Sequence, residues 1–147
     1  MPCKRTHSGV GLATGLAVGV LATQRVDQEY RPAEVVFAAI GGWIGGVTPD
    51  VLEPASDPNH RALFHSLTAG GGVCALAASD WVASVRAAAD RCAIRAAAAP
   101  EGSELRQSEE LKCVIWHCLA GLLLGFLAGY GSHLLLDAMT PRGLPVL

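Results

Sequence analysis

Ionisable side chains gather in one short stretch of an otherwise apolar chain, from Pro49 to Ser66 (PDVLEPASDPNHRALFHS). Its charged residues and histidines are Asp50, Glu53, Asp57, His60, Arg61 and His65. Near the C-terminus, His133 and Asp137 are four positions apart, which places them on one face of a helix. An imidazole and a carboxylate on one face can bind the same divalent cation. These residue types predict metal chemistry, and the alternative is a set of interfacial caps and hydrogen bonds.

Four apolar segments would position these groups. They cover residues 8–23, 33–48, 62 to about 85, and 113–139. Each has few charges and is near the roughly 20 residues that a helix needs to span a bilayer. Hydrophobic residues make up 51% of the 147-residue chain and charged residues 16%, below the usual quarter or so. We therefore expect one domain, residues 1–147, with an all-α fold: a small multi-pass bundle of about four spanning helices in the cytoplasmic (inner) membrane.

Glycine spacing supports the membrane interpretation. Two segments repeat glycine at every fourth position: Gly11, Gly15 and Gly19, and then Gly121, Gly125 and Gly129. This spacing lines one helical face with small residues, so that two helix backbones can approach closely in lipid. In a water-soluble helix each glycine would cost roughly 1 kcal/mol relative to alanine. The alternative is a soluble alanine-rich bundle, and a homo-oligomer through the glycine faces is a further expectation.

A polar insert, residues 86–112, separates the last two apolar segments. Asp90, Arg91 and Arg95 are spaced for a short helix, and APEGSE over residues 99–104 predicts a turn. The insert has no catalytic pattern. The net charge of −2 gives no indication of nucleic-acid binding. The five cysteines form no CxxC pair, which favours small buried hydrophobes over a zinc or disulfide framework.

Following the four segments across a bilayer brings the ionisable groups together. With the N-terminus on side A, the first segment leads to side B and the second returns to side A at Asp50. The third and fourth segments repeat this crossing, so that His133 and Asp137 also end on side A, where His7 opens the first segment. Such groups at a membrane are costly unless they are paired or ligated, and they indicate function. His117 starts the fourth segment on side B, where we expect a structural histidine.

The motifs around these groups occur in a defined order: THSGVG, GGVTPD, HRALFHS and GYGSHLLLDAMTPRGLPVL. With these motifs the chain resembles the LexA-binding, inner-membrane-associated family of metal-dependent hydrolases. The resemblance covers nearly the whole chain outside the insert and implies a multi-helical membrane protein. The metal ligands that it implies are His7, Asp50, His60, His65, His133 and Asp137. Leu52 departs from the family, whose members often have a second acidic residue there, and Glu53 is the neighbouring substitute.

Imidazoles with carboxylates suit zinc, with manganese or iron as competitors. Six ligands exceed the four of a closed structural zinc site, which favours an open catalytic metal or a pair of metals. The predicted reaction is attack of a metal-activated water on an ester or phosphoester, with a membrane lipid or lipid-linked phosphate as the expected substrate. Glu53 is the predicted general base, and Arg61 is predicted to hold a phosphate or stabilise negative charge.

Two other functions remain open. In the first, a metal only ties helix ends together in a non-catalytic membrane adaptor. In the second, histidine and aspartate side chains carry protons or metal ions across the membrane. The ligands gather at the ends of the segments rather than at mid-bilayer, where transport sites usually lie, and this argues against the carrier.

Overall fold

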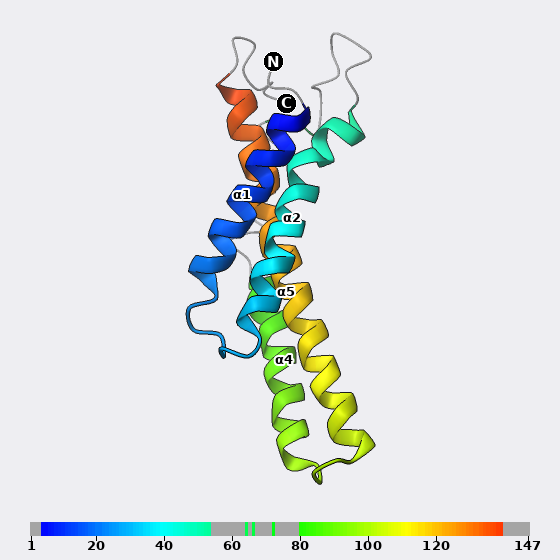
Figure 1. The fold of residues 1–147 in the computed structure, drawn as a ribbon. Coiled ribbons are helices and arrows are strands. Elements are labelled where there is room, and N and C mark those ends of the chain that lie inside the picture. Colours follow the sequence, from blue (N-terminus) through cyan, green and yellow to red (C-terminus); the bar gives the residue numbers. More distant parts are fainter. Residues whose placement is uncertain (1–3, 54–63, 65, 67–71, 73–79, 140–147) are drawn as a thin grey trace.

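The described part of the chain is entirely helical. The computed structural model describes residues 4–53, 64, 66, 72 and 80–139. Within these residues there are four helices and no strand: α1 (Lys4–Ala22), α2 (Arg31–Leu52), α4 (Trp81–Ala98) and α5 (Glu104–Ala138). Figure 1 shows α1, α2 and the later part of α5 packed together, with α4 and the first part of α5 extending beyond them as a hairpin. The all-α prediction is confirmed for these residues.

Glycine faces hold α1, α2 and α5 together at close range. A Cβ added to Gly11 or Gly15 of α1 would overlap the backbone of α2 at or beside Gly42. A Cβ added to Gly121 or Gly125 of α5 would overlap the α2 backbone one or two turns earlier. The repeated glycines therefore serve the close backbone approach that their spacing predicts, between helices of one chain. Association of two chains through glycine faces stays a prediction.

α2 and α5 run parallel in a constant register. The contacting pairs, each 87 positions apart, are Glu34–Gly121, Ala38–Gly125, Gly42–Gly129 and Gly46–His133. One small residue occupies each turn of this ladder, so the two backbones stay in contact along its length. The next turn of the same register brings Asp50 of α2 level with Asp137 of α5.

The predicted polar insert forms most of the hairpin. α5 begins at Glu104 after a turn in which Gly102 has φ +73°, a value that favours glycine. The Ser103 hydroxyl oxygen accepts a hydrogen bond from the Arg106 N–H (3.2 Å) and so caps α5. The predicted short helix and turn are both present. However, α4 already starts within the third predicted segment, and the fourth segment continues a helix that begins in the insert.

The hairpin has its own small core and its own ion pairs. The buried core residues are Ala89, Cys92 and Cys113. For these two cysteines the interpretation as small buried hydrophobes is confirmed. Glu109 of α5 accepts from Arg95 Nε of α4 (2.7 Å), which joins the two helices, and from Lys112 Nζ within α5 (2.6 Å). These ion pairs join residues of the hairpin alone, whereas Tyr30, at the start of α2, packs against the hairpin core.

Two of the described helices, α2 and α5, are long and apolar enough to cross a membrane. α5 has 35 residues and is about 52 Å long, more than the roughly 30 Å of a hydrocarbon core, so its polar first turns extend outside that layer. α1 is helical over most of the first predicted segment but is less apolar. Residues 62–85, the third predicted segment, lie mostly outside the described residues. The arrangement with four spans stays a prediction.

Candidate metal centre

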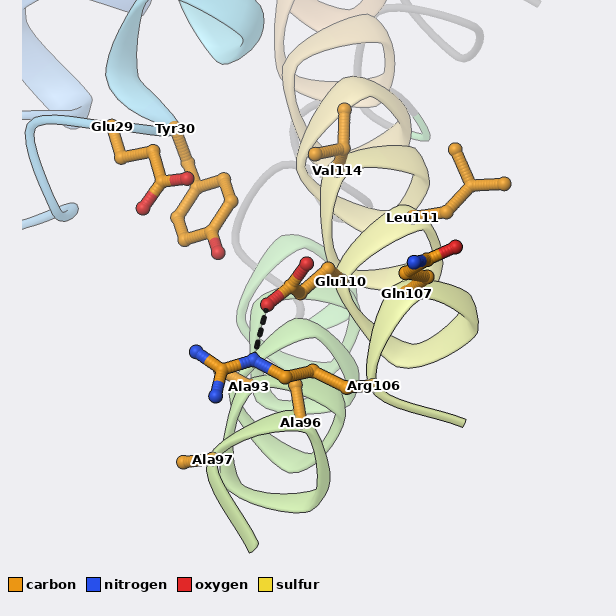
Figure 2. Close-up of a pocket in the computed structure, with 10 residues that line it drawn as sticks. All are labelled: Glu29, Tyr30, Ala93, Ala96, Ala97, Arg106, Gln107, Glu110, Leu111 and Val114. Carbon is orange, nitrogen blue, oxygen red and sulfur yellow. Dashed lines mark hydrogen bonds and ion pairs between the residues drawn. The ribbon is translucent and has the colours of Figure 1, made fainter. Parts of the chain in front are cut away.

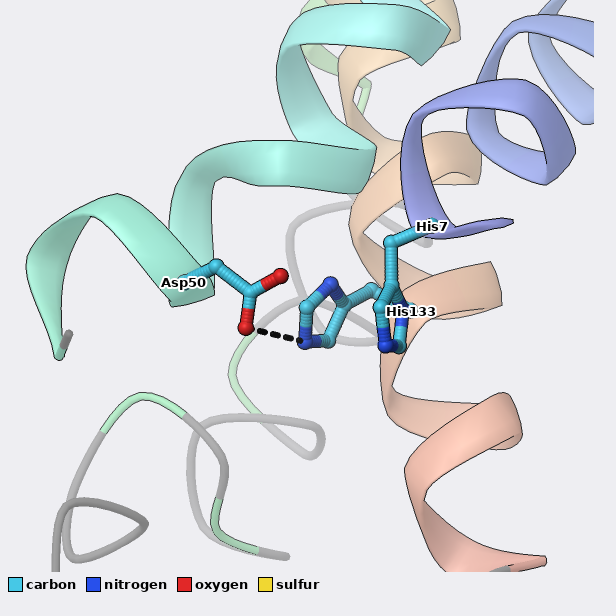
Figure 3. Close-up of side chains that lie close together, drawn as sticks. All are labelled: His7, Asp50 and His133. Carbon is cyan, nitrogen blue, oxygen red and sulfur yellow. Dashed lines mark ion pairs between the residues drawn. The ribbon is translucent and has the colours of Figure 1, made fainter. Parts of the chain in front are cut away.

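Three helices bring two histidines and an aspartate together at the end of the bundle that the sequence predicts to lie on side A. His7 lies in the first turn of α1, Asp50 near the end of α2, and His133 in the last two turns of α5. One ligand atom of each lies within 4.8 Å of the others. His7 and His133 are buried, whereas Asp50 is partly exposed. Figure 3 shows the three side chains converging from α1, α2 and α5. The structure thus joins three of the predicted ligands, and their role as ligands stays a prediction.

Asp137 extends this cluster from the same end of α5. It lies one turn after His133 and is 1% exposed. Its carboxylate oxygens are 3.7 Å from His7 Nε2 and 3.6 Å from His133 Nε2. Asp50 Oδ1 is 3.9 Å from His133 Nε2, and the two imidazole rings stack with centroids 3.8 Å apart. Two imidazoles and two carboxylates therefore share one small volume.

His133 is held in a defined tautomer. Its Nδ1 is 2.7 Å from the carbonyl oxygen of Gly46 in α2. Because a carbonyl oxygen only accepts hydrogen bonds, Nδ1 carries the proton and donates it. In the neutral ring Nε2 then has the lone pair, and Nε2 is the atom nearest to Asp50 and Asp137. A backbone carbonyl that fixes the ring in this way is typical of the groups that orient metal-binding histidines.

The donor set fits a divalent metal. Zinc takes imidazole nitrogen and carboxylate oxygen at about 2.0–2.2 Å, so four such ligands stand roughly 3.4 Å apart. The separations of 3.6 and 3.9 Å around His133 Nε2 are close to this value. Manganese and iron accept the same mixture of nitrogen and oxygen ligands. The cluster also combines neutral donors with negative carboxylates, which would compensate the charge of a cation.

One family of known proteins matches the whole chain, and its description names a membrane. All of residues 1–147 match the model of a family described as YdjM inner membrane protein. The chain belongs to the YdjM inner membrane protein family. Membership of this family, together with the apolar helices α2 and α5, supports the inner-membrane part of the resemblance seen in the sequence. The match does not extend to LexA binding, hydrolysis or a metal. No curated protein and no solved structure matches the chain.

Glu53, the predicted general base of this YdjM family member, binds the backbone of a later residue. Its Oε2 accepts a hydrogen bond from the Phe64 N–H (3.0 Å). The Tyr130 hydroxyl of α5 donates to the Phe64 carbonyl oxygen (2.7 Å). Glu53 and Tyr130 therefore hold Phe64 from both sides of its backbone. The remaining predicted site residues, His60, Arg61 and His65, lie outside the described residues.

A second buried polar cluster lies at the other end of α2, which the sequence predicts to lie on side B. Glu34 of α2 is 0% exposed, and Arg86 of α4 donates to its carboxylate through Nη2 (2.6 Å) and Nε (3.1 Å). His117 Nδ1 of α5 is 2.7 Å from Glu34 Oε1, and the Tyr30 ring stacks on the imidazole with centroids 4.6 Å apart. His117 is thus the buried, partnered residue that its position predicted. The sequence analysis did not identify Glu34 as the partner of His117, although Glu34 is a lone carboxylate inside an apolar segment.

A hollow of about 570 Å³ lies along the hairpin (Figure 2). None of its described lining residues belongs to the His7–Asp50–His133 cluster. The hollow is bordered by Tyr30 at its upper end and by α4 and α5. Among the described residues that line it, Arg106 and Glu110 pair with each other, Nε to Oε1 at 2.9 Å. Since these two charges neutralise each other and most other lining side chains are apolar, the hollow offers no set of groups for metal chemistry.

Proposed function

We propose that this inner-membrane protein is a metal-dependent hydrolase whose metal is held on side A by His7, Asp50, His133 and Asp137. The main support is the convergence of His7, Asp50 and His133 from three helices, with ligand atoms within 4.8 Å of one another, and the approach of the Asp137 carboxylate to both imidazoles. Ionisable groups at the ends of apolar helices are costly unless they are paired or ligated. The tight glycine contacts of α2 with α1 and α5 bring the three helix ends close enough for such a centre.

A divalent metal in this centre would supply an acidified water and a Lewis acid for an ester or phosphoester. The residues of the chain supply position and access. The Gly46 carbonyl orients His133, and Asp137 lies within 3.7 Å of both imidazoles. The Asp50 side chain is 22% exposed, whereas those of His133 and Asp137 are at most 1% exposed, so water and substrate reach the cluster from the Asp50 side.

The proposed substrate is a membrane lipid or a lipid-linked phosphoester, because the cluster lies at the ends of two helices that can span a membrane. In this proposal the protein is multi-pass, and the metal is zinc, with manganese or iron as competitors. His60 and His65 are proposed as further ligands for one or two ions. Glu53 is the proposed general base and Arg61 the proposed phosphate contact.

The same cluster also favours one other function. Because it joins the ends of α1, α2 and α5, a metal there could tie the helices together in a non-catalytic membrane adaptor. Its position at the helix ends argues against a proton or metal-ion carrier, whose site usually lies near mid-bilayer.

The test separates metal binding from turnover. Protein purified in detergent is analysed for zinc, manganese and iron, and is then assayed on bis-p-nitrophenyl phosphate and on a short-chain phospholipid, with and without chelator. We expect bound metal and chelator-sensitive hydrolysis in the wild type, both lost in His133→Ala. The control His117→Ala, on side B, should keep its metal per folded protein. Metal without turnover would identify the adaptor, and protein without metal would end both proposals.

A further inference from the structure

A hollow of about 490 Å³ lies at the opposite end of α2 from the metal centre and beside the middle of α5, on the predicted side B. Its volume is within the range of about 300–1,000 Å³ that is typical of small-ligand pockets. Its ionisable lining residues come from the α1–α2 connection, α4 and α5, and are Arg25, Asp27, Arg86, Asp90 and His117. The proposed hydrolase uses none of these residues, so their gathering needs a separate explanation.

One wall of this hollow is fixed by Glu34. The buried carboxylate takes two N–H groups of Arg86, at Nε and Nη2, and leaves Nη1 and further N–H groups for a ligand. The same carboxylate binds Nδ1 of His117, which leaves Nε2 as the second polar atom of that ring. Tyr30 packs flat on the imidazole, with an interplanar angle of 9°. A guanidinium and an imidazole are therefore held in place before any ligand binds.

The rest of the lining carries both signs of charge. Arg25 adds a second guanidinium, and Asp27 and Asp90 add two carboxylates. Within the part of the chain that the structure describes, the side chains of these three residues form no ion pair with one another or with a neighbour. Arg25 and the free N–H groups of Arg86, whose charge Glu34 compensates, thus face the same hollow as two carboxylates that form no ion pair among the described residues. This balance is complementary to a zwitterion rather than to a simple anion.

With α2 across a bilayer, the hollow would lie at the level of a membrane surface. α2 has 22 residues and a length of about 33 Å, close to the thickness of the hydrocarbon core. Glu34 is in the first turn of α2, so with α2 across the bilayer the cluster is at the side B boundary. Ala22 and Val26 line the hollow beside the charged groups, and the apolar bundle lies directly next to it.

We propose that this hollow binds the headgroup of a zwitterionic phospholipid, a phosphodiester that carries a primary amine, as in phosphatidylethanolamine. Arg86 and Arg25 would contact the phosphate, and Asp27 and Asp90 the ammonium group. The binding is noncovalent and holds the α4–α5 hairpin against the membrane surface. It is independent of the hydrolase on side A.

The experiment is isothermal titration calorimetry, in which each probe is titrated into the full chain in nonionic detergent. The probes are dihexanoyl phosphatidylethanolamine, dihexanoyl phosphatidylglycerol and inorganic phosphate. We expect the ethanolamine lipid to bind most tightly. Arg25→Gln and Asp90→Asn, at exposed positions, should each weaken its binding about tenfold, the loss of one charge-assisted contact. Asp90→Asn should not weaken the binding of dihexanoyl phosphatidylglycerol, which has no ammonium group.

The matched control is Arg91→Gln, which removes an exposed charge next to Asp90 but outside the hollow and should bind the lipid like the wild type. Three results would overturn the proposal: equal affinity for inorganic phosphate, tighter binding of the glycerol lipid, or unchanged ethanolamine-lipid affinity in both variants. Neither substitution touches the side A cluster, so metal content should stay at the wild-type level. Failure here therefore leaves the hydrolase proposal standing, and the reverse also holds.

Discussion

His133 and Asp137 are the two residues on which the proposed metal centre depends most, since each contacts another member of the cluster and both are buried. We expect His133→Ala and Asp137→Ala each to remove most of the bound metal. Losing one leaves the other facing a poorly held cation. The double variant should be hardly worse than either single one, because residues that act as a unit are non-additive. Elemental analysis per folded protein measures all three.

Leu135→Ala is the control for this pair. Leu135 lies between the two residues on α5 but is 69% exposed, so its truncation should leave the metal content unchanged. Full metal occupancy in both single variants would show that the cluster is not the metal site.

Glu109 in the hairpin makes the stability of the protein depend on pH. Its hydrogen bonds from Lys112 and then from Arg95 lower the pKa of the carboxyl from 4.5 to about 2. The stabilisation is therefore fully present above pH 4.5 and is lost as pH falls through about 2. Glu109→Gln should lower Tm at pH 7, and the difference from the wild type should shrink towards pH 2. Thermal unfolding followed by circular dichroism measures both.

Glu101→Gln is the matched variant, because the Glu101 side chain is 95% exposed and its nearest cationic atom, on Arg106, is 4.0 Å away. It should have little effect on Tm at any pH. A Tm difference for Glu109→Gln that stayed constant from pH 7 to pH 2 would mean that the ion pairs are not its cause.

Among the helices, the contact of α2 with α5 is the one that positions the site, because it sets Gly46 against His133. A Cβ on Gly125 would overlap the Ala38 backbone. We expect Gly125→Ala to separate the two helices, to lower stability by about 1–3 kcal/mol and to weaken metal binding. Gly131→Ala, on the same helix with nothing within 4 Å of an added Cβ, should be neutral or gain about 0.5–1 kcal/mol. Equal effects of the two variants on unfolding would contradict the role of the ladder.

The sequence predicted where these helices lie along the chain better than it predicted which helices pack against one another. Apolar length and glycine spacing indicated α2, α5 and the use of small faces, and a spacing of four placed His133 and Asp137 on one face. The 87-residue register and the Glu34–His117 pair were not predictable in this way, because periodicity within a segment does not specify which distant segment packs against it. The start of α5 at Glu104 was missed for a related reason: the polarity changes at residue 113, but no residue there breaks a helix.

The whole molecule has a polar cluster at each end of an apolar bundle packed through glycine. Along α2, Glu34 and Asp50 are about 24 Å apart, and along α5 His117 and His133 have the same separation. Since ionisable groups avoid the hydrocarbon layer, this spacing suits helices that cross between two membrane surfaces. The proposed headgroup site and the proposed metal centre would then serve opposite faces of one membrane.

α2 and α5 are parallel, so if both span the membrane they cross it in the same direction, and the hairpin turn and the Asp50 cluster lie on opposite sides. We expect reporter fusions placed after Glu101 and after Leu147 to report opposite sides of the membrane. A fusion after Asp27, in the α1–α2 connection, should agree with Glu101, because the Glu34 cluster joins that end of the bundle to α4. Paired alkaline phosphatase and green fluorescent protein fusions distinguish the two sides. If the fusions after Glu101 and Leu147 report the same side, α5 does not cross the bilayer, and the placement of both sites at membrane surfaces is wrong.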